Sequence, residues 1–277
     1  MNDKMRIAGY LLLCLFIFVG CKEERRVITP IVPGGDRIIL LEEFTGKGCS
    51  NCPKGSREIE NLLSLYGENL VVVSIHAGFF ANPTFFDIGT YDLRTDEGEA
   101  LFDYLGPNSG YPAGVVNRIS FNGELQLTAS AWAGFIGNEI EKQPDVEFQI
   151  EKNFDSANGQ VDATIKGRAK NAISGDIRIS IMLIENDIVD AQDDVDAGGI
   201  IEDYKHKHVL RGMLTKFDGE TFTDQLSVGE SFELSFSGMI LPEWNSSNMD
   251  IVAFISNLIS EDGSFTVLQA GQLHLTD

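Results

Sequence analysis

The chain has 277 residues, a length that favours two domains over one. Hydrophobic residues make up 43% and charged residues 23%, which is typical of a globular protein with a sizeable core and excludes a largely disordered chain or a polytopic membrane protein. Acidic residues number 42 against 21 basic ones, for a net charge of -21. This balance argues against nucleic acid as a partner, because binding to phosphates needs clustered Lys and Arg.

The N-terminus has the pattern of an export signal. Lys4 and Arg6 precede an apolar run, residues 7–19, that is too short to cross a bilayer as a helix. The run ends at Gly20-Cys21, which resembles the lipobox of bacterial lipoproteins, where the cysteine is lipidated and becomes the new N-terminus. We therefore expect a signal peptide over residues 1–20 and lipidation of Cys21. The alternative is a simple secretory signal in which Cys21 has no role.

The segment after this cysteine is expected to be a lipidated tether, residues 21–36, since it is rich in Pro and Gly. Lys22-Glu23-Glu24 resembles the signal that sends lipoproteins to the cell surface in Bacteroidota, and an ordinary charged tether is the alternative. The expected location is the cell envelope, at the outer membrane through the lipid, with cell-surface exposure left open. The membrane is thus one expected partner.

Two further cysteines, Cys49 and Cys52, form a CxxC pair between two predicted elements. An apolar run at residues 37–44 predicts a buried strand, and an amphipathic stretch from Pro53 predicts a helix that stops near Gly67. The free amides and the dipole of a helix N-terminus favour a thiolate, so Cys49 is the candidate nucleophile and Cys52 the resolving thiol. A cysteine pair also fits an oxidising compartment outside the cytoplasm.

The predicted elements then continue in chain order: a strand at 69–75, a helix at 94–105, a strand at 113–117, a strand at 120–127 with a hairpin turn at Asn122-Gly123, and a helix at 128–142. This order resembles the thioredoxin fold over residues 37–144. The resemblance implies that Pro112 is a cis proline beside the disulfide and that Glu43 is a buried acid that passes a proton to the inner cysteine. Gly48 and the Phe-rich insert at 76–91 depart from that family.

From Asp145 onward, short alternating runs separated by turn signals predict a series of strands. The predicted runs are 146–150, 160–166, 177–184, 209–214, 232–236, 251–255 and 265–275. Many short strands of this kind favour a β-sandwich. The predicted fold class is therefore an α/β thioredoxin-like domain over 37–144, followed by an all-β sandwich domain over 145–277.

Two polar groups in the second segment are weighed as metal sites. The first is an acidic stretch, residues 187–199, with four aspartates: Asp190, Asp193, Asp194 and Asp196. Carboxylates suit calcium, but the spacing does not match an EF-hand loop, so a solvated acidic loop is favoured. His206 and His208 alternate with Lys205 and Lys207, so on a strand both would face one side and suit a transition metal; with no third ligand in the pattern, a structural role is favoured. No cofactor is therefore expected.

Two short segments carry a more specific resemblance. Glu43-Phe44-Thr45-Gly46, followed by Cys49-Ser50-Asn51-Cys52-Pro53, is similar to the outer membrane protein 28 family of Bacteroidota lipoproteins. That resemblance implies a thioredoxin-like domain followed by a β-rich domain, and it leaves open whether the protein is an enzyme. The favoured function is binding or interaction at the envelope. The alternative is a thiol-disulfide oxidoreductase that uses Cys49 and Cys52 on envelope proteins or peptides.

Overall fold

A computed structural model describes residues 36–106, 110–258 and 265–276 of this chain. The elements of its first part are β1 (Ile39–Thr45), α2 (Cys52–Tyr66), η2 (Gly67–Asn69), β2 (Leu70–His76), η3 (Phe79–Ala81), α3 (Asp96–Tyr104), β3 (Ala113–Val116), β4 (Leu127–Thr128) and α4 (Ala129–Ile140). Those of its second part are β5 (Val146–Asp155), β6 (Gln160–Ala169), β7 (Ile173–Glu185), β8 (Ile188–Asp194), β9 (Gly199–His206), β10 (Val209–Met213), β11 (Glu220–Leu226), β12 (Ser231–Met239), η4 (Ser246–Asn248), β13 (Met249–Leu258) and β14 (Phe265–His274). The fold is mostly β.

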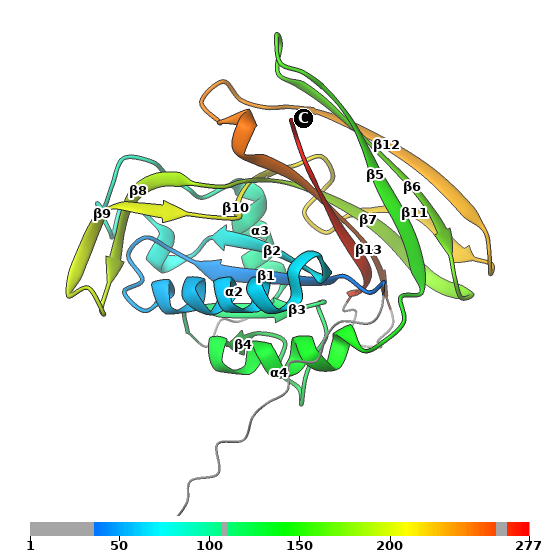
Figure 1. Cartoon of the computed structure of the whole chain (residues 1–277), viewed down its shortest axis with the longest axis horizontal. Coiled ribbons are helices and arrows are strands. Elements are labelled where there is room, and N and C mark those ends of the chain that lie inside the picture. Colours follow the sequence, from blue (N-terminus) through cyan, green and yellow to red (C-terminus); the bar gives the residue numbers. More distant parts are fainter. Residues whose placement is uncertain (1–35, 107–109, 259–264, 277) are drawn as a thin grey trace, which may run out of the picture. The chain divides into compact units, whose positions relative to one another are not determined.

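A nine-stranded sheet runs through both parts of the chain (Figure 1). Its strand order is β14-β13-β7-β10-β2-β1-β3-β4, and β11 pairs with β7. Strand β1 is parallel to β2 and antiparallel to β3. Strand β10 joins the edge of β2, where the Ser74 amide donates to the carbonyl of His208 at 2.7 Å. One sheet therefore crosses the domain boundary predicted after residue 144.

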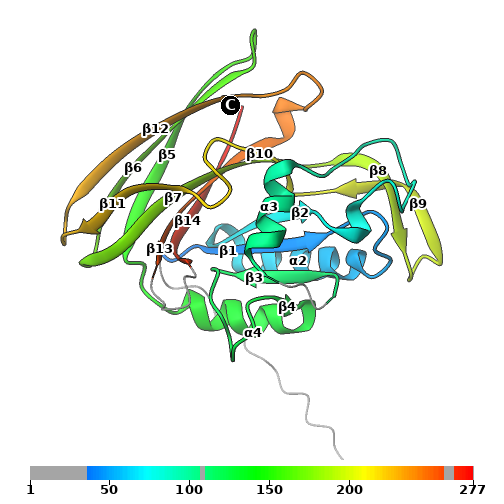
Figure 2. The same cartoon turned by 180° about the vertical axis from the view of Figure 1, so that it is seen from behind.

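Helices cover both faces of the β2-β1-β3 region. Helix α2 begins at Cys52 with Pro53 in its first turn, where a missing amide costs nothing, and ends before Gly67, which has a φ of +53°. Its apolar side packs with α4 against one face of the sheet, around the buried Trp132. Helix α3 packs against the opposite face, in a cluster that also contains Phe254 of β13 (Figure 2).

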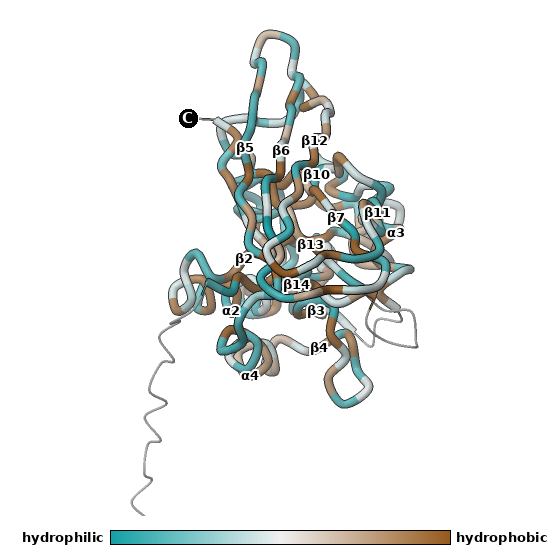
Figure 3. The backbone as a smooth tube through the Cα atoms, turned by 90° about the vertical axis from the view of Figure 1, so that its right-hand side faces the viewer, coloured by the Kyte–Doolittle hydropathy of each residue, from teal (hydrophilic) through white to brown (hydrophobic). Residues whose placement is uncertain are grey.

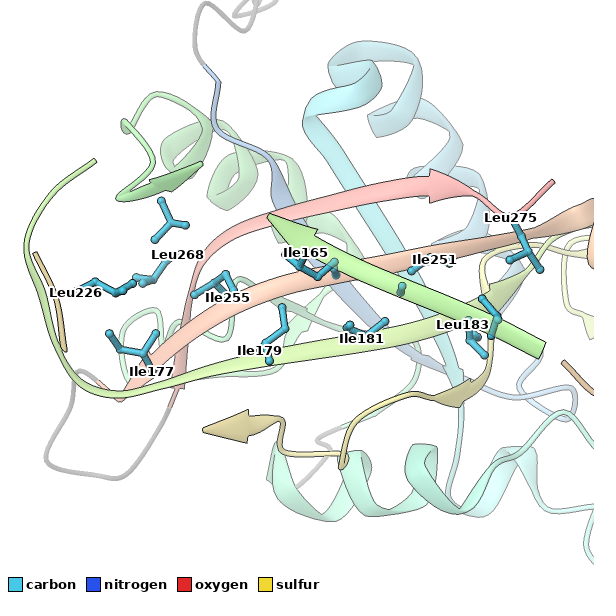
Figure 4. Close-up of a cluster of buried hydrophobic side chains, with 14 of the residues drawn as sticks. Ile165, Ile177, Ile179, Ile181, Leu183, Leu226, Ile251, Ile255, Leu268 and Leu275 are labelled. Carbon is cyan, nitrogen blue, oxygen red and sulfur yellow. The ribbon is translucent and has the colours of Figure 1, made fainter. Parts of the chain in front are cut away.

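A second sheet, β12-β6-β5, packs against strands β7, β13 and β14 (Figure 4). Along the first half of β6 every other residue is fully buried, as a strand with one face on a core requires: Val161, Ala163 and Ile165. These side chains meet Ile179, Ile181 and their neighbours across the core. In Figure 3, which is coloured by hydropathy, β13 is mostly hydrophobic, whereas the turn between β5 and β6 is hydrophilic. Two facing sheets thus share one apolar core.

The structure differs from two of the predicted elements. The strand predicted at 120–127 is present only as Leu127–Thr128, because the residues before it turn back on themselves through a bridge between Phe121 and Glu124. The prediction of a solvated loop at 187–199 is wrong, because β8 and β9 form an antiparallel hairpin over this stretch. Asp190 and Asp194 are buried there, so the acidic composition does not mark a solvated surface.

Two buried arginines of the first part contact strands of the second part. Arg118 donates to both carboxylate oxygens of Glu42 at 2.7 and 2.8 Å, and its guanidinium lies 4.8 Å from the ring centroid of Phe254. Arg37 donates to the carbonyls of Val267 and Leu268 in β14. The described residues accordingly belong to one compact unit. Among them, no helix combines the length and the apolar character needed to cross a membrane.

Candidate functional site

The candidate site is the CxxC pair at the junction of the loop after β1 and the start of α2. Cys49 and Cys52 form a disulfide, and their α-carbons lie 5.3 Å apart. Asn51 is the N-cap residue of α2, and Cys52 is its first residue, so the pair has the predicted position at a helix N-terminus. Cys21, the predicted lipidation site, lies outside the described residues.

Glu43 and Pro112 both pack against Gly55 near the start of α2. The Tyr111–Pro112 bond is cis, as predicted. A β-carbon at Gly55 of α2 would lie 2.8 Å from Glu43 Oε1 and 2.8 Å from Pro112 Cγ, so glycine permits this close packing. Glu43 accepts a hydrogen bond from Ser74 Oγ at 2.9 Å. Burial raises the pKa of Glu43 to about 7 although the Ser74 hydrogen bond opposes the shift.

A hairpin from the second part of the chain lies over the loop that carries the disulfide. This cover hairpin, residues 188–206 (β8 and β9), lies at the same end of the sheet as the N-terminus of α2 (Figure 1, Figure 2). Its hydrogen bonds to the 46–50 loop are Asp193 N–H to Lys47 O at 2.9 Å, Val195 N–H to Ser50 O at 2.9 Å, Gln192 Nε2 to Cys49 O at 3.1 Å and Gln192 Nε2 to Gly46 O at 3.3 Å. The cover hairpin thus binds the main chain around Cys49.

The insert between β2 and α3 covers the loop as well. A β-carbon at Gly48 would lie 2.2 Å from Cγ of Phe86, so the aromatic ring occupies the place of a side chain before Cys49. As a result of both covers, Cys49 is only 3% exposed and Cys52 only 1%. Thiol-disulfide exchange needs a thiolate to reach a sulfur along the bond axis. In this conformation neither sulfur is open to a partner protein.

A polar cavity of about 40 Å³ lies between α2, the end of β2 and the cover hairpin. Its walls include Glu43, His76, His206 and His208, a set of titratable side chains from distant parts of the sequence. Burial lowers the pKa of His206 and of His208 to about 4 and holds that of His76 well below its usual value, so these imidazoles are neutral at pH 7. The cavity has room for water.

The candidate metal ligands lie in different surroundings. His206 ends β9 whereas His208 follows it with a φ of +57°, so the two histidines do not share a strand. Asp190 forms an ion pair with Lys47, with 2.8 Å between the carboxylate and Nζ. Asp194 forms an ion pair with Arg57, at 3.0 Å. Within residues 36–106, 110–258 and 265–276, no three His, Cys, Asp or Glu side chains are placed to hold a metal ion.

The sequence interpretation missed several residues of this site. Lys47 had no predicted role and Gln192 was part of the predicted loop at 187–199, yet both are buried near the disulfide. His76 lies at the end of β2, where a histidine is more often packed than catalytic, and it is buried at the cavity wall. The four Phe residues of the insert were a visible signal, but nothing local indicated that Phe86 would lie on Gly48.

Comparison with known proteins supports this fold. The solved structure of HBP35 of Porphyromonas gingivalis is similar to 87% of this chain, over 76% of its own length, with a TM-score of 0.69 and 19% identity. Protein AGR_C_4864 from Agrobacterium tumefaciens is similar over 87% of this chain and 96% of its own, with a TM-score of 0.53 and 13% identity. At these identities the likeness concerns the fold alone. Among curated proteins, no sequence matches.

A family model provides the identification. The model described as outer membrane protein Omp28 matches residues 99–275, which is more than half of the chain. This match confirms the family predicted from the sequence. An outer membrane or cell-envelope location follows from it. The chain belongs to the outer membrane protein Omp28 family.

Proposed function

We propose that this protein is a lipid-anchored outer membrane protein that acts by binding a partner, and that its disulfide is a structural link. The observation that carries this proposal is the burial of Cys49 and Cys52, at 3% and 1% exposure, under the cover hairpin and the insert. An exchange centre has to present one sulfur to a partner thiol. A link between two adjacent turns instead gains from being enclosed, because reductants are kept away.

The proposal includes a thioredoxin-like domain over residues 37–144. Three features support it: β1 lies parallel to β2 and antiparallel to β3, the CxxC pair opens the helix after β1, and the cis Tyr111–Pro112 bond precedes β3. The proposal also places residues 145–277 in a β-sandwich domain, supported by the shared core of the two facing sheets. Strand β10 then docks this second domain on β2.

A cross-linking experiment in intact cells tests the binding role. We expect the wild-type protein and a Cys49→Ser/Cys52→Ser double variant to be cross-linked to the same partner, because binding does not use the thiols. Folding of the double variant is checked by its far-UV circular dichroism. If the folded double variant loses the partner, the binding role without thiol chemistry is wrong.

The lipid anchor is tested separately at Cys21. A Cys21→Ala variant is expected to move from the outer membrane fraction to the soluble periplasmic fraction, whereas a Cys14→Ala variant, within the predicted signal peptide, is expected to stay in the membrane. Protease treatment of intact cells then separates a surface position, which Lys22-Glu23-Glu24 favours, from a periplasmic one. Retention of Cys21→Ala in the membrane would contradict the anchor.

The second candidate function is thiol-disulfide exchange with envelope proteins. The raised pKa of Glu43, about 7, together with its position beside Gly55 and Pro112, favours this function, because such an acid can pass a proton near neutral pH. Cys49 would attack a partner disulfide and Cys52 would resolve the mixed intermediate. A Cys52→Ser variant then accumulates mixed disulfides with envelope proteins. Absence of such adducts would rule exchange out.

A further inference from the structure

The cover hairpin is joined to the 46–50 loop mainly through carbonyls of the loop. Asp193 and Val195 are two residues apart, and both donate their main-chain amides to loop carbonyls at 2.9 Å. Asp193 lies in β8 and Val195 opens the turn after it, so the end of the strand and the turn bind the loop together. The Gln192 side chain adds two further hydrogen bonds to carbonyls of the same loop.

Charged contacts hold the cover hairpin in place. Asp190 forms an ion pair with Lys47 at 2.8 Å, and both side chains are buried. Its carboxylate also accepts hydrogen bonds from the main-chain amides of Thr90 and Tyr91, at 2.7 and 2.9 Å. One carboxylate therefore joins the hairpin to the 46–50 loop and to the insert. Farther along the hairpin, Asp194 receives Arg57 of α2. A buried carboxylate with this many donors is costly to disrupt.

We propose that the carbonyls of the 46–50 loop form a docking edge for the chain's own cover hairpin, and that docking of this hairpin controls access to the disulfide. Displacement of the hairpin exposes Cys49 and leaves these carbonyls without their donors. This inference does not depend on the proposed function, because it concerns access to the sulfurs whether or not a natural partner exchanges with them.

Reduction by a small dithiol reports this access. A thiolate of dithiothreitol attacks one sulfur, the Cys49–Cys52 bond breaks, and the released cysteine takes up a proton. The second thiol of the reagent then displaces the remaining cysteine, so two electrons pass to the protein and the reagent becomes a cyclic disulfide. Because docking of the hairpin and closure of the disulfide are coupled, each is expected to stabilise the other.

The test measures the rate of reduction of the full chain under native conditions. Gln192→Ala removes the side-chain hydrogen bonds to Gly46 O and Cys49 O, and Asp190→Asn weakens the pair with Lys47. We expect each variant to be reduced at least tenfold faster than the wild type. Ile200→Ala, at a position in β9 that is 52% exposed, is the matched control and should leave the rate unchanged. Equal rates in all four proteins would overturn the proposal.

Two measurements separate local opening from global unfolding and test the docking edge. In the Gln192→Ala variant, the amides of Asp193 and Val195 should exchange hydrogen faster, whereas the amide of Val252 in β13 should be unchanged; equal acceleration of all three would mean global unfolding and would contradict the proposal. A synthetic peptide of residues 188–196, added to this variant, should restore slow reduction, and a scrambled peptide should not. If the peptide of residues 188–196 does not slow reduction, the docking edge is refuted. This test uses only the Gln192→Ala variant, so it remains valid if Asp190→Asn does not fold.

Discussion

The ring of Phe86 fills the space beside the α-carbon of Gly48, so that any β-carbon there would lie 2.2 Å from Phe86 Cγ. The residue before Cys49 is thus the smallest one because an aromatic ring from the insert takes the place of its side chain. The insert supplies the apolar cover of the disulfide, and the cover hairpin supplies the polar one. Each cover can be tested by itself.

Removal of the aromatic cover should expose the disulfide. We predict that Phe86→Ala speeds reduction of the Cys49–Cys52 bond by dithiothreitol about tenfold or more, because it opens the space over Gly48. Phe85→Ala is the control, since Phe85 is 61% exposed and does not lie on Gly48. Thiol labelling after timed reduction measures both rates. The same acceleration in both variants would show that Phe86 has no special part in the cover.

Two glycines in helices should respond in opposite ways to alanine. Gly55→Ala should lower the free energy of unfolding, because its β-carbon would lie 2.8 Å from both Glu43 and Pro112. Gly134→Ala in α4 should raise it by about 0.5–1 kcal/mol, because nothing lies within 4 Å and alanine favours a helix. Urea unfolding of both variants measures the difference. A gain in stability for Gly55→Ala would contradict the packing described around Glu43.

Glu43 should make stability depend on pH. The pKa of Glu43 is raised from 4.5 to about 7, so the folded state holds this proton more tightly than the unfolded state does. The stability that this tighter proton binding adds is therefore complete below about pH 4.5. It is lost as the pH rises to 7, which lowers the free energy of unfolding by roughly 3 kcal/mol. We predict that Glu43→Gln removes this loss, so that the variant gains stability over the wild type between pH 5 and pH 8.

The buried histidines act in the opposite direction. The pKa values of His206 and His208 are lowered to about 4 from 6.5. Their contribution to the free energy of unfolding is therefore complete above pH 6.5 and is lost as the pH falls to 4. The comparison of Glu43→Gln with the wild type at each pH cancels this effect, since both proteins contain the same histidines. A constant difference in stability between the two proteins from pH 4 to 8 would show that the pKa of Glu43 is not raised.

The buried pair of Glu42 and Arg118 should be strongly coupled. Removal of one partner leaves the other charge buried, so we predict that Arg118→Met lowers the free energy of unfolding by about 3–5 kcal/mol. The double variant Glu42→Leu/Arg118→Met should recover much of this loss. Arg168→Met is the control, because its pair with Glu147 is exposed and contributes about 0–1 kcal/mol. Additive losses in the double variant would contradict the coupling.

Much of the first part of the chain could be predicted from local patterns. The apolar run of β1, the CxxC pair at the start of α2 and the proline before β3 each depend on neighbouring residues, and the structure brings Glu43 and Pro112 together around Gly55. Their roles in exchange stay predictions. Seven strands of the second part were also predicted, because their apolar residues form local runs, whereas β8, β9 and β11 were not predicted.

The covers of the site could not be predicted in this way. Asp190 looked solvated because its partner Lys47 lies 143 residues earlier, and no local pattern indicates a pair over that distance. The pairing of β10 with β2 likewise joins Val209 to Ser74 across the predicted domain boundary. Buried charges and added edge strands depend on contacts between distant residues, which composition and periodicity do not record.

The burial of Cys49 and Cys52 implies that the folded protein keeps their bond as a closed structural link. The reduction potential of this pair distinguishes such a link from an exchange centre, and it is measured by equilibration of the purified protein in dithiol redox buffers followed by thiol labelling. Structural disulfides have potentials below about -300 mV, whereas exchange proteins lie between roughly -120 and -270 mV. The buried disulfide predicts a value below about -300 mV. A value in the range of the exchange proteins would contradict the claim and favour the oxidoreductase.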